Sequence, residues 1–311
     1  MTHRRLGDSG LAVSTVGLGC NNFGMRIDLE ATRAVVDAAI DVGITLFDTS
    51  DSYGASEEFL RDALGDRRDQ VVLATKFGTD LKGANGPDWG ARGSRRYIRA
   101  AVERSLRRLG TDWIDLYQIH YPDPETPVEE TLSTLTDLVR EGKIRYLGCS
   151  NYAAWQLVDA DWTARGAGLE RFVSAQNHYS LLERDAEAEL LPACEAMGVG
   201  VLPYFPLASG LLTGKYRRGD APPEGGRIAT WGMDHLLSDA NFDVVEALEA
   251  YAEQRDISLL HVALGGLASR PAVASVIAGA TTPEQVRANA EAGTWEPTEG
   301  DLADLDAGLG T

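Results

Sequence analysis

The sequence contains few cysteines and no apolar run long enough to cross a bilayer. Its three cysteines, Cys20, Cys149 and Cys194, form no C-x-x-C pair, so we expect neither a disulfide framework nor a metal site, and we expect a reducing, cytoplasmic location. Runs of about 18 apolar residues are absent. No apolar stretch follows the basic N-terminal residues, as it would in a secretory signal. These absences predict a soluble globular protein.

Basic residues are also scarce, because 29 lysines and arginines stand against 47 acidic residues, which gives a formal charge of -18. Such a charge repels phosphate backbones and anionic lipid headgroups, so neither a nucleic acid nor a membrane is an expected partner. The one basic-rich segment, residues 95–108, has the apolar spacing of a helix with a solvated outer face. A monomer and a small homo-oligomer both stay open.

The dinucleotide-binding pattern G-x-G-x-x-G is missing after the first apolar run, which weakens the alternative of an open, doubly wound sheet. Instead, short apolar runs alternate with amphipathic helical patterns, and most runs are continuously apolar, as is typical of strands buried on both faces of a parallel sheet. We therefore predict a single α/β domain over residues 1–311, a closed (β/α)₈ TIM barrel. The predicted strands are residues 16–20, 44–48, 71–76, 115–120, 144–149, 172–177, 199–204 and 275–279.

Capping residues indicate where the helices begin. Asp28 is the predicted N-cap of the helix before the second strand, and Thr126 is the predicted N-cap of the helix after the fourth strand. Two unusually long connections, residues 77–93 and 205–241, follow strands. Both are therefore expected to lie over the C-terminal mouth of the barrel, where enzymes of this architecture carry their chemistry.

Four polar residues lie at or just beyond the ends of three consecutive predicted strands. Asp48 ends the second strand, Tyr53 follows it in the turn, Lys76 ends the third strand and His120 ends the fourth. Because parallel strands end at the same rim of a barrel, we expect the four side chains to meet there. A lysine that enters a barrel interior loses hydration and needs an anion, which Asp48 supplies from the neighbouring strand.

The buried Lys76 cation would allow Tyr53 to act as an acid. A phenol with a pKa of about 10 is a poor acid at neutral pH, but a fixed cation stabilises the phenolate, so we expect Lys76 to lower the pKa of Tyr53. Tyr53 would then act as a general acid while a neutral His120 donates a hydrogen bond to a carbonyl oxygen. Taken singly, these residues also fit a turn former, a packing residue or a structural ion pair. Their coincidence at one rim favours catalysis.

Four motifs, "FDTSDSYG", "ATKFG", "LYQIH" and "GCSNY", occur in this order and resemble the aldo-keto reductases. The resemblance extends from "RRLGDSGLAVSTVGLG" to "IAGATTPEQVRAN". It implies that Asp48, Tyr53, Lys76 and His120 form the catalytic tetrad of that family. It also implies a hairpin around "GDSG" that closes the N-terminal end of the barrel, and the reduction of aldehydes or ketones by hydride transfer.

The resemblance further implies that NADPH or NADH binds in extended form across the mouth. Short polar groups after the fifth and sixth strands suit the nicotinamide carboxamide, Tyr204 would stack on its ring, and a helix N-terminus would receive an adenosine phosphate. NADPH is favoured, but Gly279 and Gln285 replace basic residues that many NADPH-dependent relatives carry, so NADH stays an alternative. The predicted cofactor residues are Gly19, Cys20, Asn21, Asp48, Ser150, Asn151, Gln176, Tyr204, Phe205, Leu207, Ser209, Gly210, Lys215, Gly279, Thr281, Gln285 and Asn289.

The substrate pocket is expected to be aromatic and to accept hydrophobic or aryl carbonyls. Two other functions stay open. A cofactor-sensing binding module with little turnover would share this fold, as in relatives that serve as channel auxiliary subunits. A lyase could form a Schiff base on Lys76, although Asp48 would keep that amine protonated. The predicted substrate residues are Phe23, Phe77, Trp89, Tyr121 and Trp231.

Overall fold

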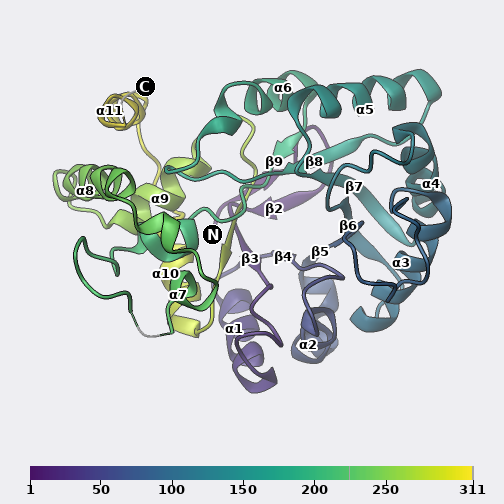
Figure 1. Cartoon of the computed structure of the whole chain (residues 1–311), viewed down its shortest axis with the longest axis horizontal. Helices are drawn as coiled ribbons and strands as arrows, with labels where there is room; N and C mark the ends of the chain where they lie inside the picture. The colour runs from purple at the N-terminus through teal and green to yellow at the C-terminus, as the bar shows by residue number, and fades with distance from the viewer. Residues whose placement is uncertain (224, 310–311) are drawn as a thin grey trace.

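The computed structural model describes residues 1–223 and 225–309, so residues 224, 310 and 311 of the predicted domain lie outside the described residues. Parallel strands form one sheet in the order β10-β3-β4-β5-β6-β7-β8-β9, with helices around its outside (Figure 1). Each strand falls on one of the predicted apolar runs. The strands are β3 (Val16–Gly19), β4 (Leu46–Asp48), β5 (Val72–Phe77), β6 (Ile114–Ile119), β7 (Ile144–Ser150), β8 (Phe172–Gln176), β9 (Gly200–Val201) and β10 (Val276–Gly279).

The two ends of the sheet meet and close the barrel. The Val201 amide in β9 donates to the Ala272 oxygen at 2.7 Å, and the Ala274 amide donates back to the Val201 oxygen at 2.9 Å. The predicted (β/α)₈ barrel is therefore confirmed. The predicted strand over residues 199–204 is shorter than expected, because Pro203 has no amide hydrogen for a ladder bond.

An antiparallel hairpin of β1 (His3–Arg5) and β2 (Ala12–Ser14) closes the N-terminal end of the barrel, as predicted. Leu6 and Val13 are fully buried and pack in one cluster with side chains from the strands. Gly7 has a φ of +57°, and a Cβ there would collide with a carbonyl oxygen just before β9, so this contact requires glycine. The C-terminal ends of the strands are left as the accessible rim.

Helices alternate with the strands and surround the barrel (Figure 1). Asp28 caps the first helix as predicted, because its side chain accepts from the Ala31 amide. The predicted cap Thr126 is wrong, since Pro127 occupies the N-cap position of its helix and the Thr126 hydroxyl donates to Asp123 at 2.7 Å. The helices are α1 (Leu29–Asp41), α2 (Ser56–Leu64), α3 (Arg95–Leu109), α4 (Val128–Arg140), α5 (Ala154–Ala167), α6 (Leu190–Met197), α7 (Arg227–Thr230), α8 (Asp239–Glu253), α9 (Leu259–Ala268), α10 (Pro283–Ala292) and α11 (Glu299–Gly308).

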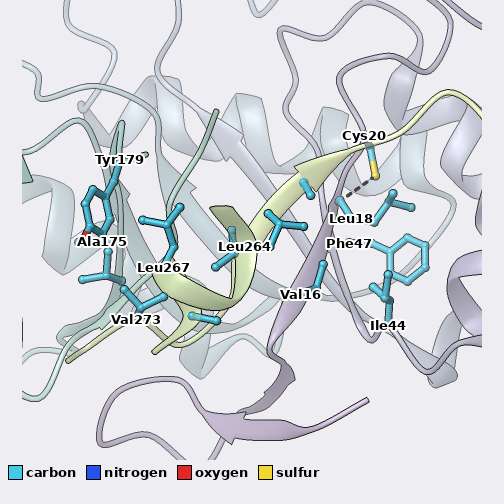
Figure 2. Close-up of a cluster of buried hydrophobic side chains, with 14 of the residues drawn as sticks. Val16, Leu18, Cys20, Ile44, Phe47, Ala175, Tyr179, Leu264, Leu267 and Val273 are labelled. Atoms are coloured by element: carbon cyan, nitrogen blue, oxygen red, sulfur yellow. Dashed lines mark hydrogen bonds between the residues drawn. The ribbon is translucent and has the colours of Figure 1, made fainter. Parts of the chain in front are cut away.

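The main hydrophobic core includes strand and helix side chains that face each other. Figure 2 shows part of it, with Leu18 and Phe47 from neighbouring strands and Leu264 and Leu267 from α9. The two long connections follow β5 and β9, and the second contains the 3₁₀ segment η3 (Ala208–Thr213) and α7. Within the described part of the chain, no helix has the length and apolar character needed to span a bilayer.

Candidate active site

A buried ion pair joins the ends of β4 and β5. Lys76 Nζ lies 2.6 Å from Asp48 Oδ2 and donates a second hydrogen bond to the Thr49 oxygen at 2.9 Å. The Lys76 side chain is fully buried. Gln118 in β6 and Gln176 in β8 donate to the other Asp48 oxygen at 3.2 and 2.8 Å, so both oxygens of the carboxylate are satisfied.

The ion pair keeps a positive charge inside the barrel. Burial by itself would lower the pKa of Lys76, but the Asp48 carboxylate and the Tyr53 hydroxyl reverse this effect, and the net result is a raised pKa. The amine is therefore protonated at neutral pH. Because a protonated amine is not a nucleophile, this geometry opposes the Schiff-base alternative.

Tyr53 follows β4 and lies beside the ammonium group. Lys76 Nζ is 5.1 Å from the centre of the Tyr53 ring. The expected lowering of the phenol pKa is wrong for this structure, because burial raises the pKa of Tyr53 by more than Lys76 lowers it, and the Asp48 charge raises it further. Tyr53 therefore holds its proton across the neutral range, as a proton donor must.

His120 follows β6 and meets Tyr53 edge-on, with 5.9 Å between the ring centres. Burial, followed by the charge of Lys76, lowers the pKa of His120 to about 3, so the imidazole is neutral at physiological pH. Its Nδ1 faces two hydroxyl groups at 3.0 and 3.3 Å. The other ring nitrogen, Nε2, is left for a ligand in the cavity that His120 lines.

A cavity of about 860 Å³ opens beside these side chains, a size typical of cofactor pockets. Asp48, Tyr53 and His120 line it, whereas Lys76 lies fully buried behind them. Every residue predicted to bind the cofactor borders this one cavity. They are Gly19, Cys20, Asn21, Asp48, Ser150, Asn151, Gln176, Tyr204, Phe205, Leu207, Ser209, Gly210, Lys215, Gly279, Thr281, Gln285 and Asn289.

Hydrogen bonds hold Asn151 and Tyr204 in place along one wall of the cavity. Asn151 has a φ of +59°, its Nδ2 donates to the His120 oxygen at 2.9 Å, and its Oδ1 accepts from the Tyr204 hydroxyl at 2.8 Å. The Tyr204 ring stacks on His178 with 5.4 Å between centres and 6° between planes. This wall presents amides and an oriented aromatic ring, which together suit a planar amide-bearing ligand.

The loop after β9 has an unusual backbone. Phe205, Ala208, Ser209 and Gly210 have positive φ angles of 52°, 43°, 58° and 99°. Non-glycine residues in this region cost on the order of 1–3 kcal/mol each and persist only where the surrounding fold holds them. The Ala208 and Gly210 amides donate to the Phe205 and Leu207 oxygens at 2.9 and 2.7 Å, and turns of this kind can form concavities that bind anions. The loop is therefore a candidate phosphate site.

Three cations, Arg26, Lys215 and Arg227, line the same cavity. Within the described residues, no ion pair engages any of them, and Arg227 Nε and Nη2 are buried without a hydrogen-bond partner. The Arg227 guanidinium lies 5.0 Å from the Phe205 ring centre and 4.3 Å from that of Trp231. Burial and the charge of Arg26 lower the pKa of Arg227 to about 10. This uncompensated charge predicts an anionic ligand.

Two predicted substrate residues, Phe23 and Phe77, do not border the cavity, and the structure corrects both assignments. Both side chains are fully buried, and Phe77 stacks on Tyr117 with 4.7 Å between ring centres. The reason lies in the alternation of side chains along a strand. Lys76 enters the barrel interior, so Phe77, the next residue, points outward into the layer between sheet and helices.

Trp89 also does not border the cavity, which corrects a third assignment. Its side chain is 76% exposed, and the Arg96 guanidinium lies 4.5 Å from its ring centre. The long connection after β5 therefore turns this tryptophan to solvent. Tyr121 and Trp231, the remaining predicted substrate residues, do line the cavity.

The sequence does not single out four other residues that line the cavity, Asn22, Arg26, Thr79 and Arg227. Asn22 directly follows the predicted Asn21, so the short polar run after β3 was a usable signal. Its Nδ2 donates to the Ala280 oxygen at 3.2 Å, and its Oδ1 is buried and has no hydrogen-bond partner among the residues that the structure describes. Arg227 carries no local signal, because its position depends on how the whole 205–241 connection folds.

The chain matches the family model for the aldo/keto reductase family over residues 15–308. It is 35% identical over 308 residues to an L-glyceraldehyde 3-phosphate reductase of Escherichia coli (strain K12), which covers 94% of this chain and 87% of that protein. It is 34% identical over 316 residues to a versiconal hemiacetal acetate reductase of Aspergillus parasiticus, covering 92% and 90%. It is 36% identical over 304 residues to a probable voltage-gated potassium channel subunit beta of Oryza sativa subsp. japonica, covering 94% and 91%.

Proposed function

The chain belongs to the aldo/keto reductase family, and from that premise we propose that it reduces aldehydes or ketones to alcohols with NADPH as the hydride donor. One observation carries the proposal. A protonated phenol, Tyr53, sits against a buried ammonium group at the edge of a cavity that is also lined by cations for which the described residues provide no ion pair. Such a site can protonate an oxygen and hold a phosphorylated ligand at the same time.

The four tetrad residues have separate roles in this proposal. A bound nicotinamide dinucleotide would supply the hydride. Tyr53 gives its proton to the carbonyl oxygen, and Lys76 stabilises the phenolate that remains. Asp48 keeps Lys76 charged through the 2.6 Å ion pair. His120 donates from Nε2 to the same carbonyl oxygen, which orients the carbonyl group and stabilises the negative charge that develops there.

The residues that line the cavity fit a dinucleotide. The loop with positive φ angles around Ser209 and the cations Arg26, Lys215 and Arg227 suit its phosphates. Two Arg227 nitrogens that have no partner in the described part of the chain would gain acceptors. We favour NADPH, whose additional phosphate would lie at the N-terminus of α10, beside Gly279 and Gln285. Titration of the protein's fluorescence with both cofactors tests this preference, and NADH binding as tightly as NADPH would contradict it.

We further propose that the substrate carbonyl lies near Tyr121 and Trp231, which line the cavity and remain 51% and 36% exposed. These rings favour hydrophobic or aryl carbonyls. We also propose that the chain acts in the cytoplasm as one barrel domain, because its three cysteines are buried and unpaired and its described elements pack around one sheet.

Substitution of the proton donor tests the proposed reaction. Tyr53→Phe removes the phenolic hydroxyl but keeps the ring, so the cavity stays intact. Turnover of 4-nitrobenzaldehyde with NADPH should fall on the order of 10²–10⁴-fold, while NADPH affinity changes little. Tyr146→Phe is the matched control, since Tyr146 lies in β7 and does not border the cavity. A Tyr53→Phe enzyme that keeps wild-type turnover would contradict the role of Tyr53.

The similarity to a potassium channel subunit beta favours one alternative, a binding module that holds a dinucleotide with little turnover. The two functions share the cavity and differ in the rate of chemistry. Steady-state oxidation of NADPH with a panel of aldehydes separates them. Sustained consumption supports the reductase, whereas tight NADPH binding without measurable consumption supports the binding module.

A further inference from the structure

Two hydroxyl groups contact His120 Nδ1 and influence which ring nitrogen carries the hydrogen. Its Nδ1 lies 3.3 Å from Ser50 Oγ and 3.0 Å from Thr79 Oγ1. The neutral ring has one hydrogen, and Nε2 can donate to a carbonyl oxygen only if that hydrogen is on Nε2. A hydroxyl hydrogen must then point at Nδ1 to hold this tautomer.

Ser50 has one hydroxyl hydrogen and three nearby acceptors for it. Besides His120 Nδ1, they are Ser52 Oγ at 2.9 Å and Asp51 Oδ1 at 3.4 Å. The Ser52 amide donates to Ser50 Oγ at 3.2 Å, and Ser50 is buried, so its orientation is set by these neighbours. An ionised carboxylate is the strongest acceptor of the three, whereas a protonated one can itself donate.

Asp51 is buried just past β4 and is held by Asn85, whose Nδ2 donates to Asp51 Oδ2 at 3.1 Å and to the Tyr97 hydroxyl at 3.2 Å. The charged neighbours of Asp51 are Glu57 from α2 and Arg108 from α3, and these two form their own 2.6 Å ion pair. Burial and the Glu57 charge raise the pKa of Asp51 to about 7, although Asn85, Arg108 and Ser50 oppose this.

Two tyrosines complete the surroundings of Asp51, and neither competes with it for a proton near neutrality. Tyr97 from α3 has its pKa raised to about 12, chiefly by burial. Burial also raises the pKa of Tyr117 in β6, and its buried hydroxyl has no hydrogen-bond partner within residues 1–223 and 225–309. Both phenols are therefore neutral where Asp51 changes charge.

We propose that Asp51 is a positioning residue for His120 and that the two are linked through Ser50. When Asp51 is protonated, it donates to Ser50, and the Ser50 hydrogen points at His120 Nδ1 and holds the hydrogen on Nε2. When Asp51 is ionised, it takes the Ser50 hydrogen, and Thr79 is the one described hydroxyl left for Nδ1. The inference rests on the proposed function, because donation from Nε2 matters for carbonyl reduction.

The consequence is that kcat/KM falls as the pH rises through neutrality. The tetrad itself does not predict this fall, because the pKa values of Tyr53 and Lys76 are raised and that of His120 is about 3. Loss of one neutral hydrogen bond that supports the reactive tautomer corresponds to a fall of roughly three- to tenfold.

The test is the pH profile of kcat/KM for 4-nitrobenzaldehyde with NADPH in four proteins. The wild type should lose activity above neutral pH. In Asp51→Asn the amide can donate to Ser50 at every pH, so kcat/KM should stay at the high value that the wild type has at low pH. In Ser50→Ala, kcat/KM should stay at the low value that the wild type has at high pH. Asp37→Asn, which changes an exposed acid on α1, should follow the wild type. Profiles of Asp51→Asn and Ser50→Ala that both keep the wild-type fall would overturn the inference.

A second readout needs no turnover, and its main measurement is made on the wild-type protein. In protein labelled with ¹⁵N-histidine, the Nδ1 resonance of His120 should shift with the titration of Asp51 while the ring stays neutral, and Asp51→Asn should abolish that shift. A shift in a protein without reductase activity would support the link and contradict the proposed function. Reductase activity with a pH-independent His120 resonance would overturn the link and leave the proposed function standing.

Discussion

The cavity has two halves that are built differently. The strand half carries Asp48 and Lys76 at the ends of β4 and β5, and each charge is paired within the protein at 2.6 Å. The loop half is formed largely by the connection after β9 and carries Lys215 and Arg227, which no ion pair engages among the described residues. Asp48 and Lys76 lie within regular strands, whereas the loop half includes Ser209 at a φ of +58°.

This difference separates positioning from binding. In the strand half the Asp48 and Lys76 charges are paired with each other, so these side chains hold their geometry before any ligand arrives, as efficient proton transfer requires. The loop half concentrates positive charge and strained backbone in a protein with a formal charge of -18. Its positive charges and strained backbone indicate a site that binds an anion.

The largest effect should come from breaking the pair in the strand half. Asp48→Asn leaves the buried Lys76 ammonium without its anion, which should lower the free energy of unfolding by about 3–5 kcal/mol in urea titrations. Asp62→Asn is the control, because it breaks an exposed pair with Arg61 and should change stability little. Equal effects of the two substitutions would remove the distinction between a buried, completed pair and a surface pair.

The next effect concerns Asp51, a buried acid just past β4 that forms no ion pair with any described residue. Because its pKa is raised to about 7, the folded state binds a proton that the unfolded state releases near its ordinary pKa. Its contribution to stability is therefore lost as the pH rises toward 7. Relative to Asp51→Asn, the wild type should lose about 3 kcal/mol of unfolding free energy between about pH 5 and pH 8. A pH-independent difference would contradict the raised pKa.

In the loop half, a charge deletion should affect binding rather than stability. Arg227→Met removes a half-buried guanidinium of which two nitrogens find no hydrogen-bond partner among the described residues, so stability without ligand should not fall. The Kd for NADPH should rise roughly 10- to 100-fold, with kcat little changed. Arg217→Met is the control, since Arg217 pairs with Glu249 and does not border the cavity. Unchanged NADPH affinity in Arg227→Met would contradict a phosphate-binding loop half.

The smallest effect tests the strain in the loop half. Ala208 has a φ of +43°, where glycine is favoured, so Ala208→Gly should raise the free energy of unfolding by up to about 1 kcal/mol. Ala34→Gly, at an exposed position within α1, should lower it by about 1 kcal/mol. Opposite signs in thermal unfolding would confirm that the loop backbone is strained, and a loss of stability in both variants would show that it is not.

Sequence patterns were sufficient to predict the residues of the strand half, because the features that place them are local. The end of each apolar run locates a strand end, and the parallel arrangement then brings Asp48, Lys76 and His120 to one rim. The same reasoning, carried one step further, would have placed Phe77 correctly, since it alternates with Lys76. The net pKa of Tyr53 was not accessible in this way, because the depth of burial that raises it depends on the complete packing around the site.

The sequence by itself determined the alternation of strands and helices, the closed barrel and the residues that end its strands, because hydrophobic periodicity and capping act over a few residues. Only the tertiary structure decided which long-range neighbours meet in the cavity. Arg227 reaches it from a connection without local signals, Asp51 shares its surroundings with Glu57 and Asn85, and Trp89 turns to solvent. Charge and burial act through space between segments far apart in the chain, so their balance exists only once the chain has folded.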